Sequence, residues 1–171
     1  MTRSRAVFIL VFLAATAGRP LQAATMYRLT LEDLVVKADR IVIGRVIESQ
    51  TFRSKERNLI LTRHKVVIQE SLKGPSAASV EVTTIGGQMG ETVLQVSGMP
   101  ALNVGEDLLL FLKPSGEYMS VLGWQQGKYS IRNGEVSNTM AGLSFSDGLP
   151  GKTVRMSIEA FKRQILERLG K

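Results

Sequence analysis

The sequence predicts a mainly β fold with a short helix near the N-terminus and an amphipathic helix at the C-terminus. β-branched and alternating segments fill the middle of the chain, at residues 41–47, 59–72 and 79–84. Helical spacing of apolar residues is found near the two ends, after Thr30 and after Ser157. Turns rich in glycine and proline separate the β segments.

Residues 1–23 have the three parts of a cleavable signal peptide. Arg3 and Arg5 precede the apolar run of residues 6–15, and small residues lead to cleavage after Ala23 or the next alanine. The alternative is a retained membrane anchor, but the apolar run is shorter than the roughly 20 residues that span a bilayer. We therefore expect an exported protein, secreted or periplasmic.

The remaining residues 24–171 have the length of one domain with its own core. The chain has no cysteine, which excludes disulfides, thiolate metal sites, cysteine nucleophiles and lipoprotein anchoring. The net charge of +7 comes from arginines in the leader and from an excess of basic residues in 152–171. Because residues 24–151 are neutral overall, we do not expect a nucleic-acid-binding protein.

The first predicted elements are a helix over residues 31–37, capped by Thr30, and a strand over 41–47. Gly44 within that strand indicates a bulge or a sharp bend. The polar stretch 53–58 predicts a loop before the long second strand.

A glycine-rich connection over residues 85–91 follows the third strand. Residues 108–112 are apolar on both faces, which predicts a central strand. Asn133-Gly134 predicts a tight hairpin. The other expected elements are strands over residues 92–96, 118–124 and 128–132, a long loop over 138–151 and a helix over about 157–169.

Catalytic, metal and cofactor signatures are weak, and we expect none of these sites. His64 is the single histidine, it lies inside a predicted strand, and no Gly-x-Ser-x-Gly elbow accompanies it. One histidine without cysteine argues against a zinc site. Gly86, Gly87 and Gly90 lack the spacing and the Lys-Ser/Thr ending of a phosphate loop, which leaves a β connection or a binding loop.

Two segments have a structural and a functional interpretation. Trp124 and Tyr129 flank a turn with two amides, and they are either core aromatics or exposed anchors for a partner. The C-terminal helix carries Lys162, Arg163 and Arg168 opposite its apolar side. It can lie on an anionic membrane, but packing against the β structure is favoured.

Residues 38–131 resemble the netrin-like modules, which include the inhibitory domain of tissue inhibitors of metalloproteinases. They are also similar to a group of bacterial secreted proteins with the same layout. The resemblance is carried by residues 38–46 (ADRIVIGRV), by 71–75 (SLKGP) and by 105–112 (GEDLLLFL). It implies a closed β-barrel of the oligonucleotide/oligosaccharide-binding (OB) type. The inhibitors of that family chelate the zinc of the protease through an N-terminal cysteine, so that mechanism cannot apply to this cysteine-free chain.

The sequence-based expectation is a non-catalytic module that binds another protein, with a secreted protease among the candidates. One alternative is a cell-envelope or glycan binder that uses Trp124 and Tyr129, and another is a hydrolase with an unrecognised site around His64. The expected barrel core is Ile41, Ile43, Val66, Ile68, Val80, Val82, Leu108, Leu110 and Leu112. The expected binding residues are Gly86, Gly87, Met89, Trp124, Gln125, Gln126 and Tyr129.

Overall fold

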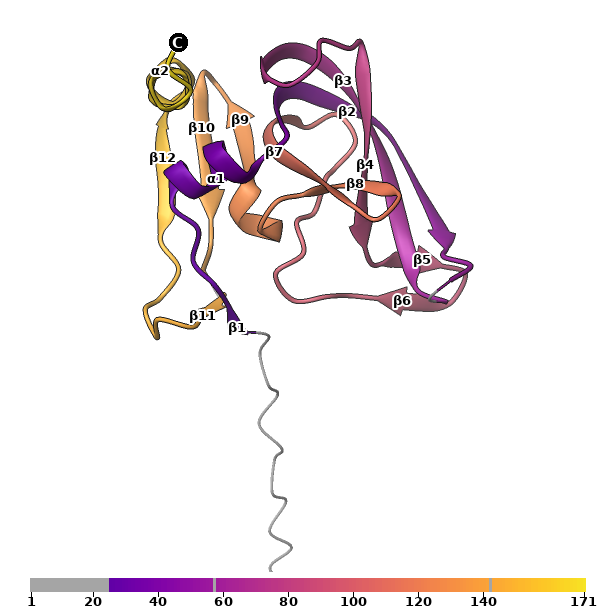
Figure 1. Cartoon of the computed structure of the whole chain (residues 1–171). Helices are drawn as coiled ribbons and strands as arrows, with labels where there is room; N and C mark the ends of the chain where they lie inside the picture. The colour runs from indigo at the N-terminus through magenta and orange to yellow at the C-terminus, as the bar shows by residue number, and fades with distance from the viewer. Residues whose placement is uncertain (1–24, 57, 142) are drawn as a thin grey trace, which may run out of the picture.

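A strongly curved antiparallel sheet organises the protein (Figure 1). The computed structural model describes residues 25–56, 58–141 and 143–171, so the expected signal peptide over residues 1–23 lies outside the described residues. The predicted mainly β fold with one helix near each end of the described chain is confirmed.

Eight strands form the main sheet, in the order β12-β10-β9-β7-β2-β3-β4, with β8 added beside β7. Two short pairs lie outside it, the parallel pair β1-β11 and the hairpin β5-β6. The strands of the main sheet are β2 (Arg40–Arg53), β3 (Ile60–Lys73), β4 (Ser79–Ile85), β7 (Asp107–Ser115), β8 (Tyr118–Val121), β9 (Lys128–Arg132), β10 (Glu135–Thr139) and β12 (Thr153–Ser157). The short strands are β1 (Thr25–Met26), β5 (Gly87–Met89), β6 (Thr92–Leu94) and β11 (Ser144–Phe145).

The expected closed barrel is not confirmed. The sheet curls until β4 lies beside β8, but no strand pairing joins the two. β4 pairs with β3 alone and β8 pairs with β7 alone. The curled part therefore has a seam between β4 and β8.

Both predicted helices are present. Helix α1 (Leu31–Lys37) begins with a capping box in which Thr30 and Asp33 satisfy each other's backbone amides. Helix α2 (Ile158–Arg168) begins at Ser157, whose hydroxyl accepts a hydrogen bond from the Ala160 amide. The helices lie on the same side of the sheet and contact each other (Figure 1).

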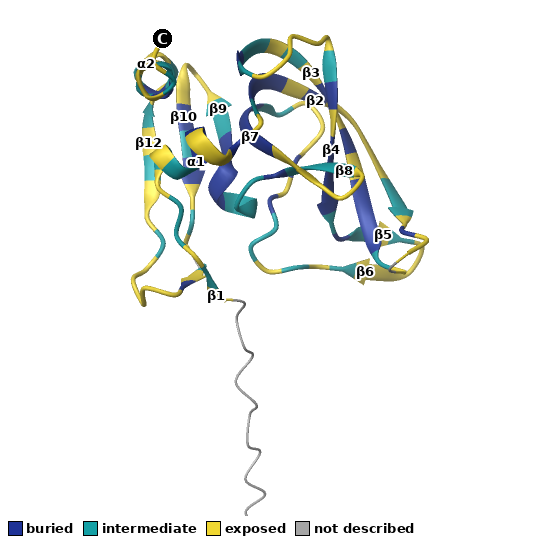
Figure 2. Cartoon of the chain, viewed as in Figure 1, coloured by how far each residue is buried: buried dark blue, intermediate teal, exposed yellow. Residues whose placement is uncertain are grey.

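Strand β7 separates two hydrophobic cores (Figure 2). Leu109 and Phe111 face the helices, where they pack with Tyr129, Phe161 and Ile165. The alternate residues of the strand face the inside of the curl, in a second core made of Val42, Val46, Val66, Val80, Val82, Leu102, Leu108, Leu110, Leu112 and Val121. All five residues from Leu108 to Leu112 have 0% exposure, which confirms the predicted central strand.

The single core expected from sequence is thus divided in two. Ile41 and Ile43 belong to the helix-side core, because alternate residues of β2 point to opposite faces of the sheet. Ile68 is half-buried at the edge of the inner core.

The bulge predicted at Gly44 is confirmed by a register shift between Ile43 and Gly44 in the β2-β3 pairing. A Cβ atom at Gly44 would lie 2.3 Å from the Val67 carbonyl oxygen, so only glycine allows this approach of the two strands. The predicted Asn133-Gly134 hairpin joins β9 to β10, with φ angles of 51° and 74°.

Four expected boundaries differ from the structure. Strand β2 continues to Arg53, well beyond the apolar segment that predicted it. The glycine-rich connection contains β5, and the expected strand over residues 118–124 ends at Val121, before the 3₁₀ helix η1 (Trp124–Gly127). Residues 138–151 are not one loop, since they contain the end of β10 and all of β11, and the unpredicted strand β12 follows.

The adjacent carboxylates Glu106 and Asp107 connect β7 to β9 and β2. Glu106 accepts hydrogen bonds from Lys128 Nζ at 2.7 Å and Ser130 Oγ at 2.6 Å. Burial raises the pKa of Glu106, but these hydrogen bonds outweigh it and hold the pKa below its ordinary value. Asp107 pairs with Arg45 of β2, with Nε and Oδ1 separated by 2.8 Å.

One buried side-chain amide helps to attach the segment that carries β1 to the rest of the molecule. Gln126 is 2% exposed, and its Oε1 accepts a hydrogen bond from the Leu29 amide at 2.8 Å. Its Nε2 donates to the Tyr27 carbonyl at 3.0 Å. Arg28 adds an ion pair with Asp147. The Gln126 side chain thus satisfies the backbone of residues 27 and 29 as a neighbouring strand would.

Truncation of Leu110 tests the central strand. We expect Leu110→Ala to lower the free energy of unfolding by about 2–5 kcal/mol, because it opens a cavity in the inner core. Val93→Ala is the matched control, since Val93 is 65% exposed on β6. Urea denaturation measures both. An unfolding free energy close to wild type for Leu110→Ala contradicts the central placement of β7.

Removal of the Gln126 amide tests the attachment of the N-terminal segment. We expect Gln126→Ala to lower the unfolding free energy by about 1–3 kcal/mol, because two backbone groups lose their partner. Hydrogen exchange of the Leu29 amide should accelerate. Gln125→Ala serves as the control, since its side chain makes one long hydrogen bond, of 3.4 Å to Thr139. Unchanged exchange at Leu29 in Gln126→Ala would disprove this role.

Candidate functional site

A cavity of about 190 Å³ opens at the seam between β4 and β8, and we call it the β4–β8 cavity. Strand β4, the start of β3, the β7-β8 turn and η1 each contribute to its walls. The cavity is present because β4 and β8 approach without pairing. The lining residues are Ser54, Glu56, Leu59, Leu61, Thr83, Thr84, Ile85, Met99, Ser115, Gly116, Glu117, Tyr118, Ser120, Val121 and Trp124.

Apolar walls and an acidic rim characterise this cavity. The walls include Leu61, Val121 and Trp124, and the charged residues among the lining are Glu56 and Glu117. A hydrogen bond with Glu117, burial, and the negative charges of Glu117 and Glu56 raise the pKa of Tyr118. The two carboxylates therefore act on the same phenol.

Trp124 is held in an unusual backbone conformation at this cavity. Its φ angle is 57°, in the left-handed region that bulky residues seldom adopt. The preceding Gly123 has φ 65°, and the Gln125 amide donates to the Gly98 carbonyl at 3.0 Å. Strain of this kind is found at functional sites, where surrounding contacts keep it in place.

Two of the predicted binding residues are buried and have structural roles. Tyr129 is 5% exposed, and its ring lies 4.5 Å from that of Phe161 in the helix-side core. Gln126 holds residues 27 and 29, as described above. Neither side chain can be reached by a partner, so we leave both out of the candidate surface. Gln125 is half-buried beside Trp124.

The predicted glycines approach protein atoms closely, so they do not form an open loop for a ligand. A Cβ atom at Gly87 would lie 2.4 Å from Thr62 Oγ1, and one at Gly86 would lie 2.7 Å from the Leu94 carbonyl oxygen. The Gly86 carbonyl accepts a hydrogen bond from Thr62. Both glycines line an open groove of about 430 Å³, which we call the His64 groove, together with His64, Thr84 and residues of the 93–103 segment.

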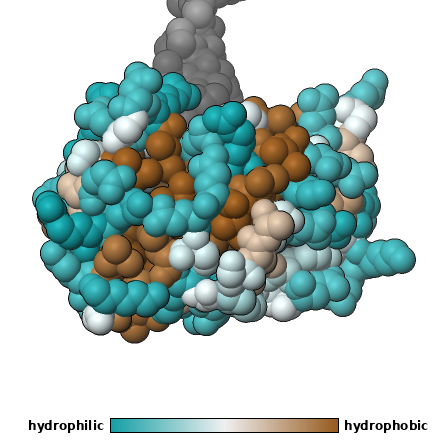
Figure 3. Space-filling model, turned by 90° about the horizontal axis from the view of Figure 1, so that it is seen from above, coloured by the Kyte–Doolittle hydropathy of each residue, from teal (hydrophilic) through white to brown (hydrophobic). Residues whose placement is uncertain are grey.

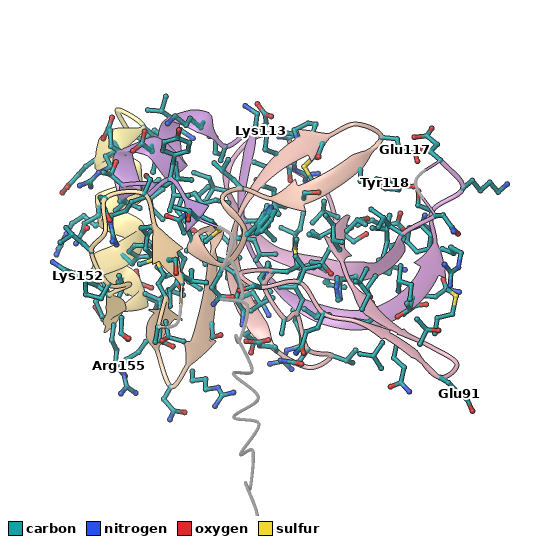
Figure 4. All side chains as sticks on the ribbon, turned by 90° about the horizontal axis from the view of Figure 1, so that it is seen from below. Glu91, Lys113, Glu117, Tyr118, Lys152 and Arg155 are labelled. Carbon is teal, nitrogen blue, oxygen red and sulfur yellow. The ribbon has the colours of Figure 1, made fainter. Side chains whose placement is uncertain are left out.

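The two predicted segments are neighbours only in part. Ile85 and Met99 line both the β4–β8 cavity and the His64 groove, so Trp124 and the glycines lie on adjoining surfaces. Met89 lines neither of them. Figure 4 shows Glu91, at the turn that follows β5, well apart from Glu117 and Tyr118.

Two hydroxyl side chains, of Ser49 and Thr84, contact the His64 ring, and neither was expected from the sequence. Nδ1 of His64 is hydrogen bonded to Ser49 Oγ at 2.8 Å, and Nε2 to Thr84 Oγ1 at 3.0 Å. Burial lowers the pKa of His64 to about 4, so the ring is neutral at pH 7. A polar patch at this position was indicated only by Thr62 and His64, which interrupt the otherwise apolar face of the second predicted strand.

Helix α2 packs against the sheet, as favoured from its sequence. Phe161 and Ile165 are buried in the helix-side core. Two of its cations pair with carboxylates of the protein, Lys162 with Glu70 and Arg168 with Glu32. Figure 3 shows polar side chains interrupting the apolar surface on the upper face of the molecule.

Within the described residues, no helix has the length and hydrophobicity that crossing a bilayer requires. The same part of the chain contains no cluster of three histidine or acidic side chains placed to bind a metal ion. No protein-family model matches the sequence, and no curated protein is significantly similar to it.

The environment of His64 predicts a specific pH dependence. The folded-state pKa of about 4 lies below the ordinary value of 6.5, so between these values the unfolded chain binds more protons. Stability is therefore full above about pH 6.5 and falls as the pH drops toward 4, by at most about 1.4 kcal/mol per pH unit.

Urea denaturation between pH 7.5 and 4.5 measures this slope. We expect His64→Gln to remove most of it and Ser49→Ala to retain it, because Ser49 does not titrate. An equal slope in wild type and His64→Gln would show that His64 is not the titrating group.

Proposed function

We propose that this protein is an exported, non-catalytic module that binds another protein through the surface around the β4–β8 cavity. A secreted protease remains among the candidate partners. In this proposal residues 1–23 are the leader, and the curled strands form an OB-like, netrin-like module with an unpaired seam.

The observation that carries the proposal is the position of Trp124, which lies at the wall of an apolar cavity with its backbone in the left-handed conformation. A large aromatic residue beside a concave apolar surface is typical of the anchor positions of protein interfaces. The half-buried Trp124 ring already packs against the protein, since a Cβ atom at Gly98 would lie 3.4 Å from its Cε3, and this reduces the entropy lost on association. Met99 extends the same surface.

The arrangement of the strands supports the netrin-like part of the proposal. The three segments that carry the resemblance lie in β2, at the end of β3 and in β7. These strands are adjacent in the order β7-β2-β3. With β4 and β8 they make five curled strands, the number in an OB fold. The unpaired seam is the departure from a closed barrel.

The competing hydrolase has one observation in its favour, the contact of Ser49 with His64. Three features weigh against it. A pKa of about 4 makes His64 a weak base at neutral pH. The Nε2 atom of His64 is hydrogen bonded to the hydroxyl of Thr84 and not to a carboxylate. The ring is 5% exposed. The glycan-binding alternative loses its aromatic pair, because Tyr129 is buried.

Capture from the exported fraction of the native source tests the proposal. We expect the immobilised protein to retain a specific protein, and Trp124→Ala to reduce its retention about tenfold or more, as for an interface anchor. Quantitative mass spectrometry of the eluted proteins measures this. Met89→Ala is the matched control, since Met89 lies outside the cavity.

Equal retention by wild type and Trp124→Ala would contradict binding at this surface. Loss of retention in Met89→Ala would extend the surface to the β5-β6 hairpin. Hydrolysis of ester or peptide substrates that disappears in Ser49→Ala, with folding intact by circular dichroism, would favour the hydrolase instead.

A further inference from the structure

We infer that the β4–β8 cavity receives a lysine or arginine side chain of the bound protein, with its aliphatic stem against the walls and its cation at Glu56 and Glu117. This inference rests on the proposed function and adds the chemistry of the contact. The size, the walls and the charge of the cavity each favour this contact.

The size of the cavity favours a single side chain over a small-molecule ligand. Its volume of about 190 Å³ is below the roughly 300–1,000 Å³ typical of small-molecule sites. One extended side chain needs much less room than such a ligand. The apolar surfaces of Leu61, Val121 and Trp124 suit methylene groups.

The charge of the rim determines which side chain fits. None of the described lining residues is a lysine, arginine or histidine, whereas Glu56 and Glu117 are both present. Neither carboxylate makes an ion pair with a cation of the described residues. A purely apolar side chain would leave both negative charges at the mouth without an ion-pair partner, but a basic one pairs with them.

One cation of the adjoining surface, Arg63, already has a carboxylate partner. Arg63 lies in the neighbouring groove with Glu117, but its guanidinium is paired with Glu81 at 3.7 Å. It also lies over the ring of Phe52, 5.0 Å from the centroid. The positive charge of Arg63 lowers the pKa of Tyr118, but the hydrogen bond with Glu117, burial and the charges of the two carboxylates outweigh it, so the mouth of the cavity stays acidic on balance.

The acidic rim also contrasts with the basic C-terminal part of the protein. Residues 24–151 are neutral overall, whereas residues 152–171 carry six basic and two acidic side chains. Figure 4 shows Lys152 and Arg155 on the side of the molecule opposite Glu117 and Tyr118. The uneven distribution of charge orients a partner whose basic residue approaches the cavity.

Two matched pentapeptides test the inference directly. Acetyl-Gly-Gly-Lys-Gly-Gly-amide and its norleucine analogue differ only in the ammonium group. Binding is followed by NMR chemical shifts of the Trp124 indole N–H of the purified protein. Peptide is added up to about 10 mM, to cover the millimolar range expected for one side chain.

We expect the lysine peptide to shift the Trp124 signal and to bind at least about fivefold more tightly than the norleucine peptide. The double variant Glu56→Gln/Glu117→Gln should reduce its affinity to that of the norleucine peptide. Glu91→Gln is the matched control, since Glu91 is an exposed carboxylate at the β5-β6 turn. Both glutamates are exposed, so the double variant should keep the melting temperature of the wild type.

Equal affinity for the two peptides, or no shift of the Trp124 signal, would overturn the inference. The capture experiment separates it from the proposed function. A partner that is lost in Trp124→Ala but retained by Glu56→Gln/Glu117→Gln supports protein binding and overturns the basic contact. Selective binding of the lysine peptide with no captured protein supports the contact and contradicts the proposed function.

Discussion

The burial of β7 on both faces is the constraint on which the rest of the structure depends. One face supports the core under α1 and α2, and the other supports the inside of the curl. Because β7 is central, it also pairs with β2, β8 and β9. Its first residue, Asp107, pairs with Arg45, and Glu106, directly before the strand, pairs with Lys128. The seam follows from the same arrangement. β7 carries the short strand β8 on one edge, and β8 comes to lie beside β4 without pairing to it.

The elements that were predicted correctly are those in which a residue type at that position has one structural role. The unbroken apolar run of β7, the glycine at the β2 bulge and the Asn133-Gly134 hairpin were all predicted correctly. The strand segments that were not predicted are rich in polar residues. The second half of β2 is polar because it is exposed or lined with hydroxyls, and β12 is an edge strand with only Val154 and Met156 turned toward the protein. The second half of β2 lacks the hydrophobic alternation that identifies a half-buried strand, whereas β12 has this alternation over five residues only, with two apolar side chains.

The candidate site was predicted only in part, for a similar reason. The region of Trp124 and Gly86 was identified by residue types that bind partners, but the same types also serve the core, as Tyr129 and Gln126 show. The acidic rim could not be inferred, because Glu56 and Glu117 are 61 positions apart and are brought together only by the curl of the sheet. The hydroxyl partners of His64 come from β2 and β4, and their convergence depends on the register of the strands.

The attachment of residues 25–29 by Gln126 has a consequence for the order of folding. These contacts join positions 97 to 122 residues apart, so they add strongly to the contact order of the chain. The Gln126 contacts cannot form until residue 126 has been synthesised, and the Arg28 contacts also need the segment around Asp147. Under the proposed export, residues 25–29 would therefore reach their native contacts only after most of the chain has been translocated.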